Sequence, residues 1–438
     1  MATWVLLQVT SPWQSTVGEP TTVRELTVAS SRQLHFSNTE AATLSFSMPG
    51  NHRQTAGLEP LVSDILAFRT EGAVTEVVQR FRVVSRVLAK DNGVMSAQFS
   101  AVSYRALLDG WLLHGTDQRS FPGTGSVAVE QTLVAWTLLS TCQARSASSN
   151  LGITRGPVPT LSETRLLQPE GSFGATGGGA EEYFAEGMKL GEAITQLAEM
   201  DKGFEWDIVP DTRVGRDPYK DLAFMTWTVG DGGRTAPVPS DLLLNDGGSV
   251  VSWSHTTTPS EYANVLRVTG PEPTAFNVTG STSAAIWQNG PTDTSIGESP
   301  TGNAALVPPE PHEGRWEAEG GSLDLQNDEA VGAAAATAWK KAHDYVPEIS
   351  VSLARGRWTG LGQLWLGSML RLLITEPVDD EPGEWILFID EDVKVMEVDV
   401  TVDELGAEDV SLSLNRSKFN ASTDARRVYD RLARIERR

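Results

Sequence analysis

Side chains able to act as nucleophiles or metal ligands are widely spaced in this sequence. The single cysteine, Cys142, ends the apolar helical pattern of residues 133–142, which predicts a buried and unreactive thiol and excludes an internal disulfide. No His-Glu-x-x-His or other metal spacing occurs among the histidines, which are His35, His52, His114, His255, His312 and His343. The sequence therefore predicts no catalytic residue, no metal ligand and no cofactor.

Two pairs of carboxylates are the nearest candidates for glycoside hydrolysis, which needs two carboxyl groups facing each other across a cleft. Glu181 and Glu182 adjoin a triple glycine, whereas Glu205 and Asp207 point outward along a predicted strand. Outward side chains of an exposed strand are normally solvated. A glycoside hydrolase is therefore only an alternative interpretation.

Two further motifs are incomplete. The acidic run of residues 390–392 lacks the alternating oxygen ligands and the glycine of a calcium loop, so calcium binding stays an open alternative. Residues 123–125, Gly-Thr-Gly, lack the lysine and the preceding strand of a phosphate loop. They are better interpreted as a turn before Ser126, which can cap a helix.

The N-terminal hundred residues carry the period-two pattern of antiparallel strands. Residues 43–48 alternate as a half-buried strand does. Residues 81–88 and 95–102 flank the turn Asp91-Asn92-Gly93, and Asn-Gly supplies the positive φ angles of a tight hairpin. The sequence therefore predicts a hairpin here.

The middle of the chain shows helical periodicity. One predicted helix places Val129, Leu133 and Trp136 on one face, and a second does so with Leu190, Ile194 and Leu197. The strand after the second helix has Phe204, Trp206 and Ile208 inward and Glu205 and Asp207 outward. An alanine-rich helix is predicted at residues 328–345.

Dense strand patterns return near the end, at residues 364–374, 385–389, 393–399 and 410–414, and their spacing suggests a small barrel. We predict an α+β, mainly β fold with tube-like antiparallel β-barrel domains at both ends and helix-bearing inserts between them. The predicted domains are 1–110 (β), 111–248 (α+β insert), 249–345 (β, with a Pro/Gly/Ser/Thr-rich arm at 270–320), 346–415 (β-barrel) and 416–438 (basic helix).

The charge balance argues against nucleic-acid binding. The 438 residues carry a formal net charge of −22, which repels polyphosphates. No stretch reaches the roughly 20 apolar residues of a membrane span, and residues 1–8 lack the pattern of a signal peptide. We expect a soluble protein made in the cytoplasm.

The order of these elements, with three local patterns, resembles the minor tail proteins of siphoviruses, particularly those that infect actinobacteria. The patterns lie at residues 193–208, at residues 262–270, and at residues 365–372 followed by 393–400. Two positions depart from the family pattern, because Ser368 stands where aspartate is commoner and Lys394 where arginine is commoner.

The resemblance implies a structural subunit and not an enzyme. Such a protein forms a homotrimeric hub at the distal end of the tail tube in the virion, with pseudo-sixfold symmetry from two tube-like β-domains per subunit. Its expected partners are the tail tube or distal tail protein, the tape measure protein, and tip or fibre proteins. Double-stranded DNA passes through its channel without specific binding, and the net acidity is consistent with that role.

The end of the chain reverses its charge, from an acidic stretch at residues 376–410 to a basic one at 411–438. Apolar residues there follow the a/d rhythm of a coiled coil. The predicted interface residues are Ala425, Val428, Arg431, Leu432, Arg434 and Ile435. A surface helix on its own acidic barrel and a docking element are both compatible with this pattern.

A carbohydrate-binding adhesin of the tail tip is the alternative from a different class, and a tail-associated cell-wall hydrolase using the carboxylate pairs above is a further one. The sequence contains 13 tryptophans, which could stack on sugars. Most of them lie within apolar runs, where core packing explains them more simply. The arm at residues 270–320 would be the binding element of such an adhesin.

Overall fold

The computed structural model describes residues 2–9, 23–114, 129–145, 150–157, 166–167, 187–199, 204–228, 243–245, 248–256, 265–269, 284–288, 317–322, 348–354, 366–377, 385–404 and 406–416. By contacts the chain divides into two units, residues 1–254 with 349–438, and residues 255–348. Each unit is described by itself. The fold is α+β and mainly β, with mostly antiparallel strands, as the sequence predicts.

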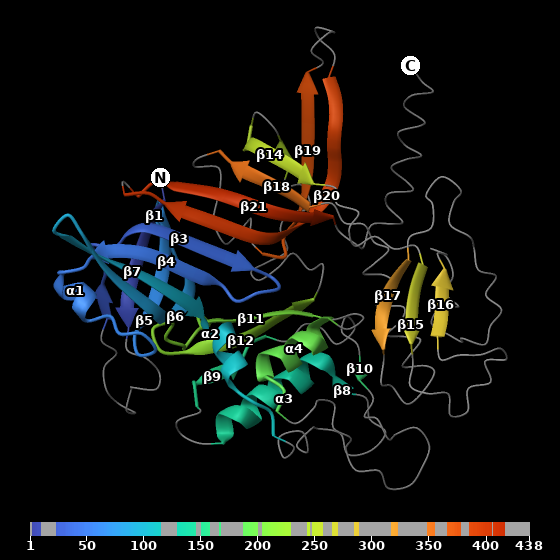
Figure 1. Ribbon diagram of the computed structural model, residues 1–438, viewed down its shortest axis with the longest axis horizontal. Helices are drawn as coiled ribbons and strands as arrows, with labels where there is room; N and C mark the ends of the chain where they lie inside the picture. The colour runs from blue at the N-terminus through green and yellow to red at the C-terminus, as the bar shows by residue number, and fades with distance from the viewer. Residues whose placement is uncertain are drawn as a thin grey trace. The chain divides into compact units, whose positions relative to one another are not determined.

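A sheet of 13 strands, called the main sheet, forms most of the first unit (Figure 1). Across the sheet the order is β14 (Val250–Thr256), β18 (Glu348–Leu353), β21 (Glu408–Arg416), β20 (Trp385–Val402), β3 (Ser30–Ser37), β4 (Thr43–Pro49), β7 (Val94–Ser103), β6 (Val74–Asp91), β5 (Asp64–Glu71), β1 (Thr3–Val9) and β2 (Val23–Glu25). Strand β19 (Met369–Pro377) branches from β20 and pairs with β13 (Leu243–Asn245). The single-turn helix α1 (Arg53–Ala56) follows β4.

The long strand β20 joins the two ends of the chain. Its first half pairs with β19, and its second half lies between β21 and β3. The sequence predicted two strands here, at 385–389 and 393–399. That boundary is wrong, because the acidic residues 390–392 continue the pairing with β19. In the second half Val400 lies opposite Leu34 of β3, so N-terminal and C-terminal strands share one sheet.

One hydrophobic core lies under the main sheet. Phe36, Phe46, Phe81 and Phe99 are among its largest fully buried side chains. The rings of Phe46 and Phe99 stack at 5.1 Å between centroids. Burial of one such side chain contributes about 1.5–3 kcal/mol. The core also includes C-terminal residues, and it therefore stabilises the junction between the two ends of the chain.

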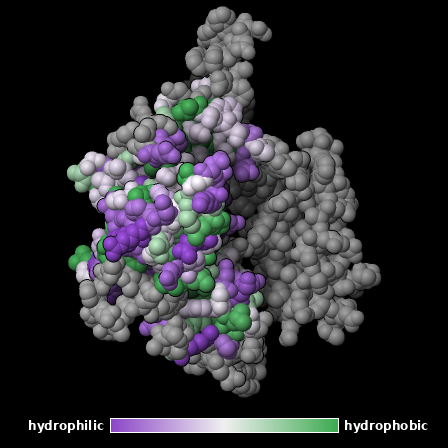
Figure 2. Space-filling model, turned by 60° about the vertical axis from the view of Figure 1, so that its left-hand side comes forward, coloured by the Kyte–Doolittle hydropathy of each residue, from purple (hydrophilic) through white to green (hydrophobic). Residues whose placement is uncertain are grey.

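The predicted hairpin at residues 91–94 is confirmed. Asp91 pairs with Val94, and Asn92 and Gly93 have φ angles of 48° and 86°. Both values are positive, as a two-residue type I′ turn requires. Val94 near the turn is 72% exposed. On the face that Figure 2 displays, hydrophobic side chains are interspersed with hydrophilic ones.

A second layer, called the helical layer, has a core of its own. It contains α2 (Tyr104–Leu107), the 3-10 helix η1 (Leu108–Gly110), α3 (Gln131–Ala144), α4 (Leu190–Glu199), and the sheet of β11 (Phe204–Pro210), β12 (Leu222–Thr228) and β9 (Ile153–Arg155). The predicted helix with Leu190, Ile194 and Leu197 on one face is confirmed, since all three are buried. The other predicted helix begins later than expected, at Gln131. Val129 lies instead in the short strand β8 (Val129–Glu130), which pairs with β10 (Leu166–Leu167).

The second unit is described only at β15 (Val265–Thr269), β16 (Ala284–Gln288) and β17 (Glu317–Ser322). Strand β15 pairs antiparallel with β16 and parallel with β17. Strand β16 and part of β17 fall within the predicted arm, 270–320. The predicted helix at 328–345 lies outside the described residues. So does the predicted basic helix at 416–438, except for Arg416, which ends β21. Within the described part of the chain, no helix is long and apolar enough to cross a membrane.

Candidate functional site

Charged and polar side chains are buried where the helical layer meets the main sheet. We call this set the polar seam. Its members are Asp64, Gln79, Arg80, Arg82, Tyr104, Arg105, Glu205, Asp207 and Lys394. Buried charges are stable only when they are paired, so the partners of each residue show what the seam does.

At the centre of the seam Asp64 holds two arginines. Asp64 begins β5 and pairs in register with Arg82 of β6. Its carboxylate contacts the Arg80 guanidinium at 2.8 Å and accepts a hydrogen bond from Arg82. The Tyr104 hydroxyl donates to the same carboxylate at 2.5 Å, and burial raises the pKa of this phenol. The four side chains are at most 2% exposed and form a buried cluster in which one carboxylate binds two guanidinium groups.

The alternation of strand β6 explains how the arginines reach this position. Phe81 points into the main core, so Arg80 and Arg82 on either side point to the opposite face. The helical layer covers that face, and Arg80 donates a hydrogen bond to the Tyr219 carbonyl at 3.2 Å. Next to it, the Gln79 amide donates to Asp207 of β11 at 2.9 Å. These contacts attach the helical layer to β6.

Arg105, on α2, bridges the two layers through backbone carbonyls. Its guanidinium donates to the carbonyls of Asn38 at 3.0 Å, Thr39 at 2.8 Å and Trp206 at 3.1 Å. It also stacks over the Trp206 ring, 4.3 Å from the centroid. Burial lowers the pKa of this guanidinium. Because Asn38 and Thr39 follow β3 and Trp206 belongs to β11, Arg105 fixes one layer against the other.

Glu205 and Asp207, the carboxylates considered for hydrolysis, do not face solvent as predicted. Glu205 accepts hydrogen bonds from the Lys394 ammonium and from the Trp227 indole, the latter at 2.5 Å. Asp207 is 8% exposed and is bonded to Gln79. The expectation of solvated side chains is therefore wrong, because the main sheet covers this face of β11. Both carboxylates serve as structural acceptors.

A second buried pair joins the ends of the chain directly. Glu408 of β21 accepts hydrogen bonds from Arg69 of β5 at 2.7 and 3.1 Å. It also accepts one from the Trp4 indole of β1 at 2.8 Å. The sequence separation between Trp4 and Glu408 is 404 residues. This hydrogen bond links the N-terminal strand β1 directly to the C-terminal strand β21.

The acidic run of residues 390–392 lies within β20. Asp390 accepts two hydrogen bonds from Arg371 of β19, at 2.7 and 2.9 Å. Neighbouring residues of a strand point to opposite faces, so the three carboxylates do not converge. Among the described residues, no group of three or more His, Cys, Asp or Glu side chains could hold a metal ion. The Cys142 thiol is buried, as predicted.

Several predicted positions lie outside the described residues. These are residues 123–125, Ser126, Glu181 and Glu182. The interface residues predicted for the C-terminal helix lie outside as well, namely Ala425, Val428, Arg431, Leu432, Arg434 and Ile435.

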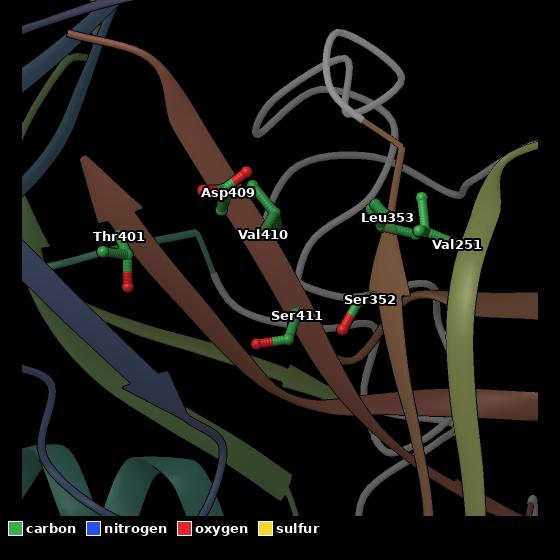
Figure 3. A pocket seen from close by; sticks show the side chains of 7 residues that line it. All are labelled: Val251, Ser352, Leu353, Thr401, Asp409, Val410 and Ser411. Atoms are coloured by element: carbon green, nitrogen blue, oxygen red, sulfur yellow. The ribbon is translucent and has the colours of Figure 1, made fainter. Parts of the chain in front are cut away.

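A hollow of 480 Å³ lies over the C-terminal part of the main sheet (Figure 3). It is lined by Val251, Ser352, Leu353, Thr401, Asp409, Val410 and Ser411. Its polar side chains are hydroxyls and one carboxylate, which do not form the pair of carboxylates that glycoside hydrolysis requires. The hollow is therefore a feature of the surface shape and is not built as a hydrolase cleft.

The seam residues were missed in the sequence because their burial depends on a distant segment. The run Gln79-Arg80-Phe81-Arg82 has the alternation of a strand with one solvated face, which is the ordinary expectation for arginine. A usable signal was the presence of two arginines on the same face as Asp64 of the neighbouring strand. Such a concentration of charge on adjacent strands favours an ion-pair cluster.

These features define a mainly β, α+β protein whose buried charges connect two layers of one unit. No protein-family profile and no curated protein matches the sequence. Solved structures do match its fold. The 43 kDa tail protein of prophage MuSo2 from Shewanella oneidensis is 11% identical with a TM-score of 0.54, covering 94% of this chain and 98% of its own. The tail protein from Neisseria meningitidis MC58 is 12% identical with a TM-score of 0.52, covering 94% and 97%. The chain therefore has the fold of these tail proteins over nearly its whole length.

Proposed function

We propose that the protein is a structural component of a bacteriophage tail and not an enzyme. The observation that carries this proposal is the match of fold over nearly the full length of two tail proteins. The internal contacts support it, because the buried carboxylates Asp64, Asp207 and Glu408 each accept hydrogen bonds from structural partners. A protein of this kind acts by keeping its shape within an assembly.

Within the tail, we propose that the chain forms a homotrimeric hub at the distal end of the tube. Residues 1–110 and 346–415 would supply two tube-like parts per subunit, and three subunits would then match a hexameric tube. The insert at 111–248 and the arm-bearing segment at 249–345 would face neighbouring proteins. These neighbours are the tube or distal tail protein, the tape measure protein, and tip or fibre proteins. Double-stranded DNA would leave through the central channel.

We further propose that the basic segment 416–438 is a docking element, either in a three-helix bundle or for the next tip protein. The charge reversal in the sequence motivates this proposal. Deletion of residues 423–438 should leave the circular dichroism of the folded strands unchanged while the trimer weakens or tails lose their distal fibre. Complete, infectious tails built from the truncated chain would contradict the docking role.

The oligomeric state of the purified full-length chain tests the hub. Mass photometry should give three times the 47.3 kDa mass of one chain, and electron micrographs should show rings with a central hole. A monomer at micromolar concentration and in the presence of the distal tail protein would contradict the proposal. Glycan-array binding would instead support the adhesin, and release of reducing sugar from cell walls would support the hydrolase.

A further inference from the structure

Six neighbouring strands of the main sheet present a continuous polar surface opposite the core. The strands are β18, β21, β20, β3, β4 and β7. On β4, for example, Leu44, Phe46 and Met48 belong to the core and alternate with Thr43, Ser45 and Ser47. The same alternation holds on the other five strands. We call the outward set the hydroxyl face, because serine and threonine are its commonest residues.

The charges of the hydroxyl face are mainly negative. Its carboxylates are Glu348, Glu397, Asp399 and Asp409. Among its described residues the alternation places one basic chain on this side, Lys394, which is buried and paired with Glu205. Its histidine, His35, is bonded to Asp399, which lies directly opposite in the register, at 2.8 Å. A basic group at this position is thus already matched by an acidic one.

The nearest basic side chains on the same strands are turned to other partners. Lys394 of β20 is held by Glu205 in the polar seam. Arg32 of β3 donates to the carbonyls of Ala29 and Trp4 at 3.1 and 2.5 Å. Basic residues are nevertheless exposed elsewhere in this unit, since Arg216 and Lys220 are 44% and 50% exposed. The lack of an exposed lysine or arginine among the described residues is therefore a property of this face and not of the whole surface.

The hydroxyl face is also broad and hollowed. Strands in a sheet lie about 4.8 Å apart, so six of them span about 24 Å. The hollow over Thr401, Asp409 and Ser411 lies on its β18–β21–β20 side (Figure 3). Most of its side chains are short serines and threonines, which offer a passing polymer few long groups to bind.

We propose that the hydroxyl face lines the channel through which double-stranded DNA leaves the tail. Proteins hold DNA mainly by pairing Lys and Arg with its phosphates and releasing counterions. A wall of hydroxyl, amide and carboxylate groups offers no such pairing, and its negative potential repels the duplex. DNA can then slide past without being retained. This inference rests on the proposed tail function and names the part of the chain that faces the DNA.

Site-specific crosslinking in particles arrested during DNA ejection tests the assignment. Single cysteines placed by Ser45→Cys and Ser411→Cys carry a photoactivated crosslinker, and Lys220→Cys is the control at an exposed position outside the main sheet. The native Cys142 is 1% exposed and should not react. Crosslinks to DNA are expected from both serine positions and at least tenfold less from position 220.

The outcomes separate this inference from the tail function. The assignment is overturned, and the tail role stays intact, if particles that contain the chain give DNA crosslinks from position 220 but not from positions 45 and 411. Particles that lack the chain would overturn the proposed function itself. As a second readout, the double variant Ser45→Lys with Ser411→Lys should slow ejection severalfold at low salt, whereas Ser45→Asn with Ser411→Asn should not. Equal ejection rates for both variants would also count against the inference.

Discussion

Replacement of Arg105 by methionine should weaken the attachment of the helical layer to the main sheet. The effect should exceed that of losing any single apolar contact between the layers. Methionine keeps much of the apolar stem but removes all three hydrogen bonds to the carbonyls of Asn38, Thr39 and Trp206. A hydrogen bond to a charged group contributes about 1.5–3 kcal/mol, and stacking on Trp206 adds about 0.5–2 kcal/mol. Since these contributions are not additive and water can reach part of the site, we expect a loss of about 3–5 kcal/mol.

Urea unfolding of the full chain, followed by tryptophan fluorescence, measures this loss. Arg86→Met is a matched control, because Arg86 donates one hydrogen bond, at 3.1 Å to the Leu58 carbonyl, within the main-sheet part of the structure. Because Arg86 is only partly buried and water can replace its single hydrogen bond, the control should lose less, about 1 kcal/mol. Hydrogen exchange should accelerate in α4 and β11 of Arg105→Met but not of Arg86→Met. Equal losses in the two variants, with unchanged exchange in the helical layer, would refute the bridging role of Arg105.

Three further substitutions test single features of the fold. Asp64→Asn leaves two buried arginines without their shared counter-charge and should cost about 3–5 kcal/mol in urea unfolding. A loss below that of Arg86→Met would show that the Asp64 carboxylate does not stabilise the buried arginines. The hydrogen bond to Asp399 raises the pKa of His35, so its contribution to stability is complete below pH 6.5 and is lost as the pH rises through the folded value. Because the pair is a third to a half exposed, the loss of stability should be a fraction of 1 kcal/mol. If the stability of His35→Gln still falls over the same pH range, the loss does not come from His35. Gly93→Ala forces alanine into a positive φ and should cost about 1–2 kcal/mol of stability. The control Gly110→Ala, which also has open space around its added Cβ, should be nearly neutral. Equal melting temperatures of the two variants would contradict the turn type.

Local features of the fold could be predicted because their signals lie within a few residues. The turn Asn92-Gly93 specifies its hairpin by backbone conformation alone. The helix α4 has Leu190, Ile194 and Leu197 on one face, and all three are buried in one core. In both cases the sequence pattern and the tertiary contacts favour the same structure.

Long-range pairing could not be predicted from the same patterns. Strand β3 pairs with β20 across more than 350 residues, and nothing in either strand identifies the other. The acidic residues 390–392 suggested a break in β20, yet Arg371 on β19 neutralises Asp390 and the ladder continues. The counter-charge for Asp390 thus comes from the neighbouring strand β19 and is absent from the local sequence.

The polar seam was missed for the same physical reason. An outward residue on a strand is solvated only if no other layer covers it. Asp207 and Glu205 alternate outward from the core of the helical layer, as expected, but they meet the main sheet there. Their partners Gln79 and Lys394 come from distant parts of the chain, so the seam exists only after both layers have formed.

A cryo-electron microscopy map of the intact particle tests the central claim most directly. We predict density at the distal end of the tail tube into which the main sheet and the helical layer fit as one body, repeated three times around a central hole. The hole should be lined by the hydroxyl face. A tail whose density is fully accounted for by other chains, with this protein absent from the particle, would contradict the account.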